Sequence, residues 1–354
     1  MPFQQNYKSG NKKFYNLFQA LDSFKQTGDH VYYEFDKEFV ESISGLNKPK
    51  NNSSKLIGDL MVKGLKQIRE KNNHVRLALG GGTDSWTIMK HCIENDIYLD
   101  EVVCGLVSFS GDVRADLEYL PAIRYAKQYE GKQIGKVITM PPTKQSLDFI
   151  NDPEWFRDPK IGQLFPMRPF FAHLARPIMN DPDSDFVNIT GMCKPIVLVK
   201  DGKPYWTQLD VKGIGEWMGV KNHCPLFYDK DNPELTVAMT YALMNALPDL
   251  KQEGVYDYDQ ITDRKIKNRI LDAFGMRLQR PWFDLNIKMK YFIKELAEIG
   301  MHDYIDKWYD SAKTIYELYK DVPYALETDG KNVKPVGRFC QMLPISSEGF
   351  GQVS

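Results

Sequence analysis

The chain has 354 residues, of which 42% are hydrophobic and 12% aromatic, enough to bury the core of one large domain or about two. Its formal net charge is −1, from 46 basic and 47 acidic residues, so the chain as a whole has no attraction to nucleic acid or to an anionic membrane. No apolar run approaches about 18 residues and no signal-peptide core is present, so we expect a cytoplasmic protein with no membrane partner.

The first 54 residues are predicted to form an N-terminal extension and linker, 1–54. Residues 12–23 have a helical pattern, and residues 31–35 have a strand pattern. The polar, breaker-rich segment 47–54 then separates this extension from a domain that we place at 55–235.

A glycine-rich loop, Gly80-Gly81-Gly82-Thr83-Asp84-Ser85, joins an apolar strand to an amphipathic helix. Glycines let the main chain approach an anion closely, and the start of a helix adds N–H groups and the positive end of its dipole. The loop lacks the lysine of a Walker loop and the spacing of the dinucleotide fingerprint. A tight turn without a ligand is the simpler alternative. We interpret the loop as a phosphate cradle, with a nucleotide as ligand.

The residues that follow alternate between strand and helix patterns. Strand patterns lie at 101–110, 136–140 and 185–195, and a helical pattern lies at 116–126. This order predicts an α/β fold with a doubly wound, mostly parallel sheet, which binds ligands at the carboxyl ends of its strands. Gly80, Ser108 and Gly191 lie at or near three such ends.

With its Asp-Ser ending, the loop resembles the Ser-Gly-Gly-x-Asp-Ser loop of the ATP pyrophosphatases, the PP-loop family. The helix pattern at 55–71, the loop and Ser108-Phe109 follow one another as in the synthetase domain of asparagine synthetase, without its glutaminase domain. The resemblance implies a sheet of the HUP/PP-loop type and an AMP-forming ligase that uses ATP and Mg²⁺. Such an enzyme adenylylates a substrate carboxylate or carbonyl oxygen, which an amine or ammonia then attacks.

The resemblance also implies roles for single residues. Asp84 would contact Mg²⁺, Ser85 would supply a hydroxyl, and Lys194 would offset charge on the leaving pyrophosphate. A solvated turn lysine is the equally weighted alternative for Lys194. The expected catalytic residues are Asp84, Ser85 and Lys194. The expected nucleotide-binding residues are Gly80, Gly81, Gly82, Thr83, Asp84, Ser85, Val107, Ser108, Phe109 and Gly191.

Two departures from the family keep other functions open. Gly80 stands where the family has serine, and the acidic residues that follow the corresponding strand in asparagine synthetase are absent after Gly191. Both favour a catalytically inactive nucleotide-binding or structural protein. A further alternative, sulfur transfer to a tRNA nucleobase, needs a reactive cysteine, for which Cys193 and Cys224 are the candidates.

The remaining segments carry weaker signals. Lys144 and Arg168 are candidates for substrate or phosphate contacts, and residues 196–209 are predicted to form a β-hairpin that acts as a lid or an edge. Residues 236–354 are predicted to be a helical C-terminal region whose helices pack as a bundle, followed by a tail. Its basic cluster at 264–269 could bind nucleic acid, although the solvated face of a helix is the favoured interpretation.

Overall fold

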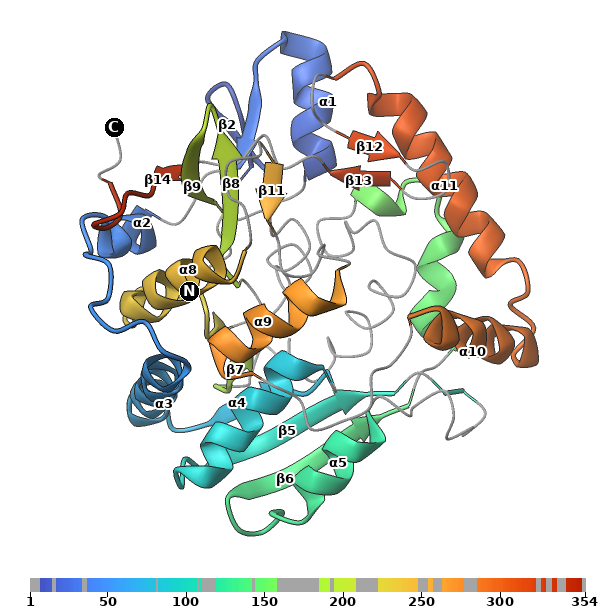
Figure 1. Ribbon diagram of the computed structural model, residues 1–354. Coiled ribbons are helices and arrows are strands. Elements are labelled where there is room, and N and C mark those ends of the chain that lie inside the picture. Colours follow the sequence, from blue (N-terminus) through green and yellow to red (C-terminus); the bar gives the residue numbers. More distant parts are fainter. Residues whose placement is uncertain are drawn as a thin grey trace.

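The computed structural model has four β-sheets among its described residues, and the two larger ones have five and four strands (Figure 1). The residues that it describes are 7–14, 17–33, 37–80, 82–106, 108–109, 119–141, 144–157, 185–191, 194–207, 222–247, 254–256, 263–276, 285–322, 326–328, 333–335 and 342–351.

The larger sheet has five strands, and every pairing in it is parallel. Its strands are β4 (Val75–Ala78), β5 (Leu99–Gly105), β6 (Ile134–Met140), β7 (Val187–Thr190) and β10 (His223–Pro225). Helices α4 (Thr83–Glu94) and α5 (Leu120–Lys127) connect successive strands and lie on one face of the sheet (Figure 1). The predicted α/β class with a parallel sheet is confirmed.

The order of the strands, β10-β7-β4-β5-β6, determines where a ligand crevice can form. From β4 the chain adds β5 and then β6 on one side, and it later returns to add β7 and β10 on the other side. The winding direction therefore reverses between β4 and β7. Because the connections diverge at such a switch point, they leave a crevice at the carboxyl ends of the two strands, where open α/β sheets bind ligands.

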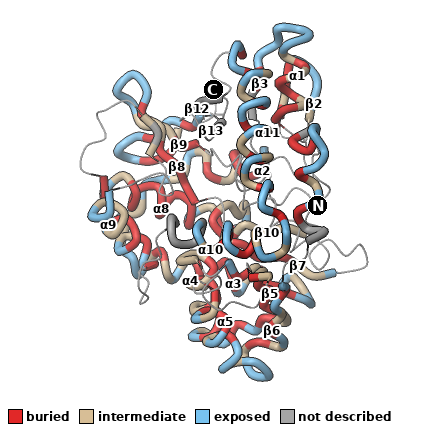
Figure 2. Tube along the Cα trace, turned by 90° about the vertical axis from the view of Figure 1, so that its right-hand side faces the viewer, coloured by how far each residue is buried: buried red, intermediate tan, exposed pale blue. Residues whose placement is uncertain are grey.

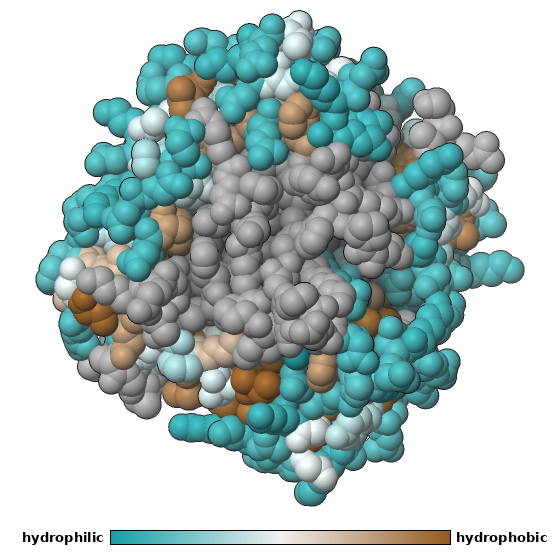
Figure 3. Space-filling view, turned by 180° about the vertical axis from the view of Figure 1, so that it is seen from behind, coloured by the Kyte–Doolittle hydropathy of each residue, from teal (hydrophilic) through white to brown (hydrophobic). Residues whose placement is uncertain are grey.

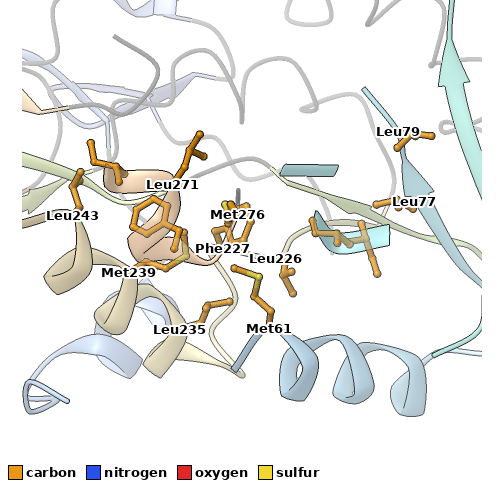
Figure 4. Packing of buried hydrophobic residues seen from close by; sticks show 14 of the residues in the cluster. Met61, Leu77, Leu79, Leu226, Phe227, Leu235, Met239, Leu243, Leu271 and Met276 are labelled. Atoms are coloured by element: carbon orange, nitrogen blue, oxygen red, sulfur yellow. The ribbon is translucent and has the colours of Figure 1, made fainter. Parts of the chain in front are cut away.

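A core of apolar side chains joins three helices to this sheet. The helices are α3 (Ser54–Lys71), α8 (Pro233–Ala246) and α9 (Arg264–Phe274). Ser53 caps α3 by accepting a hydrogen bond from the amide of Leu56. Most residues of α8 are buried (Figure 2), as expected of a helix that is apolar on all sides. Figure 4 shows Met61 of α3, Leu235 and Met239 of α8 and Leu271 of α9 gathered around Phe227.

The N-terminal segment differs from its prediction. Residues 12–14 form a strand instead of the start of a helix, because Gly10, at φ 57°, turns the chain back so that Phe14 pairs with Tyr7. The helical pattern belongs to a later stretch. The elements here are β1 (Tyr7–Ser9), β2 (Lys12–Phe14), α1 (Leu17–Thr27), β3 (Val31–Tyr33) and α2 (Lys37–Ile43).

The predicted hairpin is present, as β8 (Ile196–Lys200) and β9 (Lys203–Thr207). Its turn, Asp201-Gly202, has positive φ angles at both residues, the conformation that matches the twist of the two strands. The hairpin lies at the centre of a four-stranded sheet, between β11 (Gly254–Tyr256) and β14 (Leu343–Pro344). Both of its edges are therefore paired.

Among the described residues, the helices of the C-terminal third pack on different parts of the chain. Helix α8 packs on α9 and α3, whereas α11 (Tyr304–Tyr319) packs on another part of the chain, the turn of helix η1 (Lys144–Asn151). Trp308 of α11 lies with its ring centroid 4.7 Å from that of Trp155, in the segment that follows η1. The other elements here are η2 (Trp155–Arg157), α10 (Leu285–Glu298), β12 (Leu326–Thr328) and β13 (Val333–Pro335).

On the face seen in Figure 3, the described residues at the surface are mostly hydrophilic. Among the described residues, the large hydrophobic side chains that are exposed lie at three separate places: Tyr98 just before β5, Ile293 on α10 and Met342 just before β14. No helix in the described ranges combines the length and apolar character that a bilayer-spanning segment needs.

Candidate functional site

The glycine loop leads from the end of β4 into the first turn of α4, at the switch point of the sheet. The amide of Gly80 donates a hydrogen bond to Ser85 Oγ at 3.1 Å, which closes the loop on itself. Gly82 is the N-cap of α4, in extended conformation, and a Cβ added there would meet no heavy atom within 4 Å. The first amides of a helix have no acceptor within the helix. The loop therefore offers donors and the positive end of α4 to an anion.

A buried ion pair crosses the switch point. Lys194, four residues beyond the end of β7, places Nζ 2.7 Å from Oδ2 of Asp84, in the first turn of α4. The Lys194 side chain is only 7% exposed, and that of Asp84 is 28% exposed. An ammonium group is costly to bury without a partner. Lys194 is therefore held at the start of α4, and the solvated turn lysine that we considered as its alternative is wrong.

Gly191 brings the end of β7 into direct contact with this same turn. A Cβ at Gly191 would lie 2.6 Å from the Cβ of Asp84 and 3.1 Å from the amide nitrogen of Ser85. Real Cβ atoms do not approach other atoms so closely, so a side chain would push β7 away from α4. The close approach explains why a glycine is needed at position 191, at the contact between the end of β7 and the first turn of α4.

His223 lies beside the same edge, on β10. Its Nε2 shares a hydrogen bond with Thr190 Oγ1 at 2.7 Å, and burial lowers the pKa of His223 to about 3. The ring is thus neutral at physiological pH and helps to hold the end of β7. Its neighbour Cys224 lies in an environment unlike that of a reactive cysteine. Burial raises the pKa of the Cys224 thiol, and the nearby carboxylates of Asp229 and Asp231 raise it further.

A buried carboxylate meets the chain beyond the end of β5. Glu295 of α10 accepts a hydrogen bond from the amide of Phe109 at 2.8 Å and another from Ser108 Oγ at 3.2 Å. Sequence reasoning did not identify Glu295, although a signal was present. It lies three residues after Phe292 and one before Leu296, on the buried stripe of α10, where an acidic residue is unexpected.

The structure brings together most of the predicted site residues. Gly80, Gly82, Thr83, Asp84, Ser85, Gly191 and Lys194 meet at the switch point, while Ser108 and Phe109 follow the neighbouring strand β5. Lys144 begins η1, and nothing is described of its side chain. Gly81, Val107, Arg168 and Cys193 lie outside the described residues.

The basic cluster at 264–269 lies on α9. This helix buries Ile270, Leu271 and Phe274, while Arg264, Lys265 and Arg269 are exposed. Such a division between an apolar and a charged face is that of an ordinary surface helix.

The site has few groups that could hold a metal ion by themselves. The described residues contain no group of three or more His, Cys, Asp or Glu side chains that could hold a metal. Mg²⁺ is commonly held by one or two carboxylates together with phosphates and waters of a bound substrate. Asp84 alone therefore suits a magnesium ion that arrives with a phosphate ligand.

Three strand ends thus meet at one edge of the sheet. The ends of β4 and β7 bring the first turn of α4 and the Lys194 ammonium together, and the segment after β5, held by Glu295, follows the strand that pairs with β4. The chain matches no known protein family and no curated protein.

Proposed function

We propose that this chain is an ATP-dependent adenylylating enzyme that cleaves ATP into AMP and pyrophosphate. One observation supports the proposal above all others: the glycine loop enters α4 at the switch point of the parallel sheet, where buried Lys194 reaches Asp84 from the end of β7. A phosphate placed before α4 would meet N–H groups, a helix dipole and an ammonium group. Charge compensation of this kind stabilises the transition state of phosphoryl chemistry.

The chemistry assigns a task to each group. The amide at Gly82 and the first turn of α4 would hold the β and γ phosphates, and Lys194 would offset the charge that develops on the leaving pyrophosphate. Asp84 would hold Mg²⁺, which supplies Lewis-acid neutralisation of the phosphate oxygens when bound. The substrate's own carboxylate or carbonyl oxygen attacks the α phosphate. No protein nucleophile is needed, since positioning and electrostatics carry the rate.

We also propose a specific type for the parallel sheet. The strand order β10-β7-β4-β5-β6 supports a doubly wound sheet of the HUP/PP-loop type, and the loop supports a likeness to the synthetase domain of asparagine synthetase. By that likeness an amine or ammonia would displace AMP from the activated substrate. We accordingly propose a cytoplasmic AMP-forming ligase with ATP and Mg²⁺ as cofactors.

A catalytically inactive nucleotide-binding protein is the second candidate, and Gly80 favours it. A Cβ at Gly80 would have Ser85 Oγ, at 4.0 Å, as its nearest neighbour, so the position has room for the serine that it lacks. Gly80→Ser therefore tests this candidate directly. Sulfur transfer has less support, because the Cys224 thiol has a raised pKa.

The decisive assay is exchange of labelled pyrophosphate into ATP, measured with a panel of carboxylates that includes the amino acids. We expect exchange that depends on one substrate, and release of AMP once an amine or ammonia is added. Lys194→Met should reduce the exchange rate about 100-fold, the usual effect of removing a group that stabilises transition-state charge. Lys200→Met is the matched control, because Lys200 lies at the exposed end of β8.

Three outcomes are informative. Substrate-dependent exchange that Lys194→Met abolishes supports the proposal. Binding of ATP without exchange, which Gly80→Ser restores, supports the inactive candidate. Formation of ADP instead of AMP would contradict both.

A further inference from the structure

Glu295 occupies a position that a carboxylate rarely takes. It is 1% exposed and lies on the buried stripe of α10 with Phe292 and Leu296, which are 0% and 1% exposed. An apolar residue there would pack without loss of hydration, whereas a carboxylate is costly to bury unless polar groups bind it. A specific partner must therefore compensate for its burial.

That compensation comes from the end of β5. Glu295 Oε2 accepts both the amide of Phe109 and the hydroxyl of Ser108, which is 4% exposed. Phe109 lies 186 residues before Glu295 in the chain, so the contact joins α10 to the parallel sheet. Hydrogen bonds to a charged acceptor are stronger than neutral ones. The two hydrogen bonds to Glu295 fix the backbone at Ser108 and Phe109, which belong to no strand.

We propose that Glu295 is a positioning residue for the nucleotide base, an inference that rests on the proposed function. The seat for the phosphates lies at the ends of β4 and β7, so a nucleotide that extends along this edge brings its base to the end of β5. Adenine and guanine present different donors and acceptors on their outer edge. Backbone groups of the protein discriminate between the two bases only when the backbone itself is held in one position. Glu295 holds them, and α10 is thereby part of the nucleotide site.

The role predicts how substitutions at Glu295 behave. Glu295→Gln keeps an acceptor for the Phe109 amide, whereas Glu295→Ala leaves that amide and the Ser108 hydroxyl without this acceptor. If the segment at Ser108 and Phe109 must become ordered before the nucleotide binds, the affinity for the nucleotide is lower than with an already ordered segment. If Glu295 positions the segment, glutamine restores function. If the negative charge itself contacts the ligand, glutamine fails.

The experiment measures kcat and KM for ATP and GTP in the pyrophosphate-exchange assay, with wild type, Glu295→Ala, Glu295→Gln and Ser108→Ala. Glu298→Ala is the control, because Glu298 lies on the same helix in a surface pair with Lys294. Glu295→Ala should raise KM for ATP about tenfold, the effect of losing hydrogen bonds to a charged group, with kcat within about twofold. Its preference for ATP over GTP should shrink. Glu295→Gln should resemble wild type.

Failure of the inference differs from failure of the proposed function. If Glu295→Ala keeps the wild-type KM and base preference, the inference is overturned and the proposed function stands. A wild type that gives no exchange overturns both. Should Glu295→Ala fail to fold, Ser108→Ala decides, since it removes one of the two donors. It should raise KM about three- to fivefold, and an unchanged KM would refute the positioning role.

Discussion

We predict that replacing Asp84 destabilises the protein more than replacing Lys194, its partner in the ion pair. The Lys194 side chain is 7% exposed and that of Asp84 is 28% exposed. Asp84→Ala would leave a buried ammonium without its carboxylate, which typically costs about 3 to 5 kcal/mol in unfolding free energy. Lys194→Met would leave the more exposed of the two side chains without its partner, so we expect a smaller cost of about 1 to 2 kcal/mol.

The double variant sharpens this expectation. With both residues replaced, Asp84→Ala and Lys194→Met, the buried ammonium is gone as well. The double variant should therefore be more stable than Asp84→Ala alone, by about 1 to 2 kcal/mol. Simple addition of the single effects would make it less stable.

Urea unfolding, followed by tryptophan fluorescence, measures all three variants. Lys200→Met, at an exposed position, serves as the control and should change the unfolding free energy by less than about 0.5 kcal/mol. Equal costs for the two single variants, or a double variant less stable than Asp84→Ala, would refute the claim that burial of Lys194 dominates the pair.

Three further predictions concern the same edge of the sheet. Gly191→Ala should destabilise the protein and weaken ATP binding, because the new Cβ would lie 2.6 Å from the Cβ of Asp84. Gly82→Ala should keep the wild-type stability, because its Cβ would meet no heavy atom within 4 Å. Equal urea midpoints for the two variants would contradict this difference. Burial lowers the pKa of His223 from 6.5 to about 3. The contribution of the neutral His223 ring to the unfolding free energy is therefore present above pH 6.5 and is lost as the pH falls toward 3. The loss is at most about 1.4 kcal/mol per pH unit. His223→Gln should reduce the change of the urea midpoint with pH between about pH 4 and 6. If the midpoint of this variant changes with pH as much as that of wild type, the ring is not buried in its neutral form. Cys224, whose thiol has a raised pKa and is only partly exposed, should react with a thiol reagent more slowly than an exposed cysteine at the same pH, so labelling as fast as that of free cysteine would contradict the raised pKa.

The sequence was most informative where the pattern is local. The apolar run before Gly80, the three glycines and the helix pattern after them are adjacent in the chain, so they predicted β4, the loop and α4 together. The later strands were also recognisable because both faces of a parallel strand are buried, which gives a continuous apolar run. The hairpin turn at 201–202 is a third local signal.

The remaining features depend on distant parts of the chain. β10 has only three residues, His-Cys-Pro, and becomes a strand because it pairs with β7. Glu295 gains its partners 186 and 187 residues away, a distance over which periodicity says nothing. The strand at 12–14 was mistaken for helix because the turn at Gly10 outweighs local propensity. These features could be found only by placing the elements in space.

The most direct test of the central claim is an experimental structure with Mg²⁺ and an ATP analogue that resists cleavage between the α and β phosphates. The account predicts the phosphates at the start of α4, between Gly82 and Lys194, with the base beside Phe109. A nucleotide bound elsewhere on the protein, or none at saturating concentration, would contradict it.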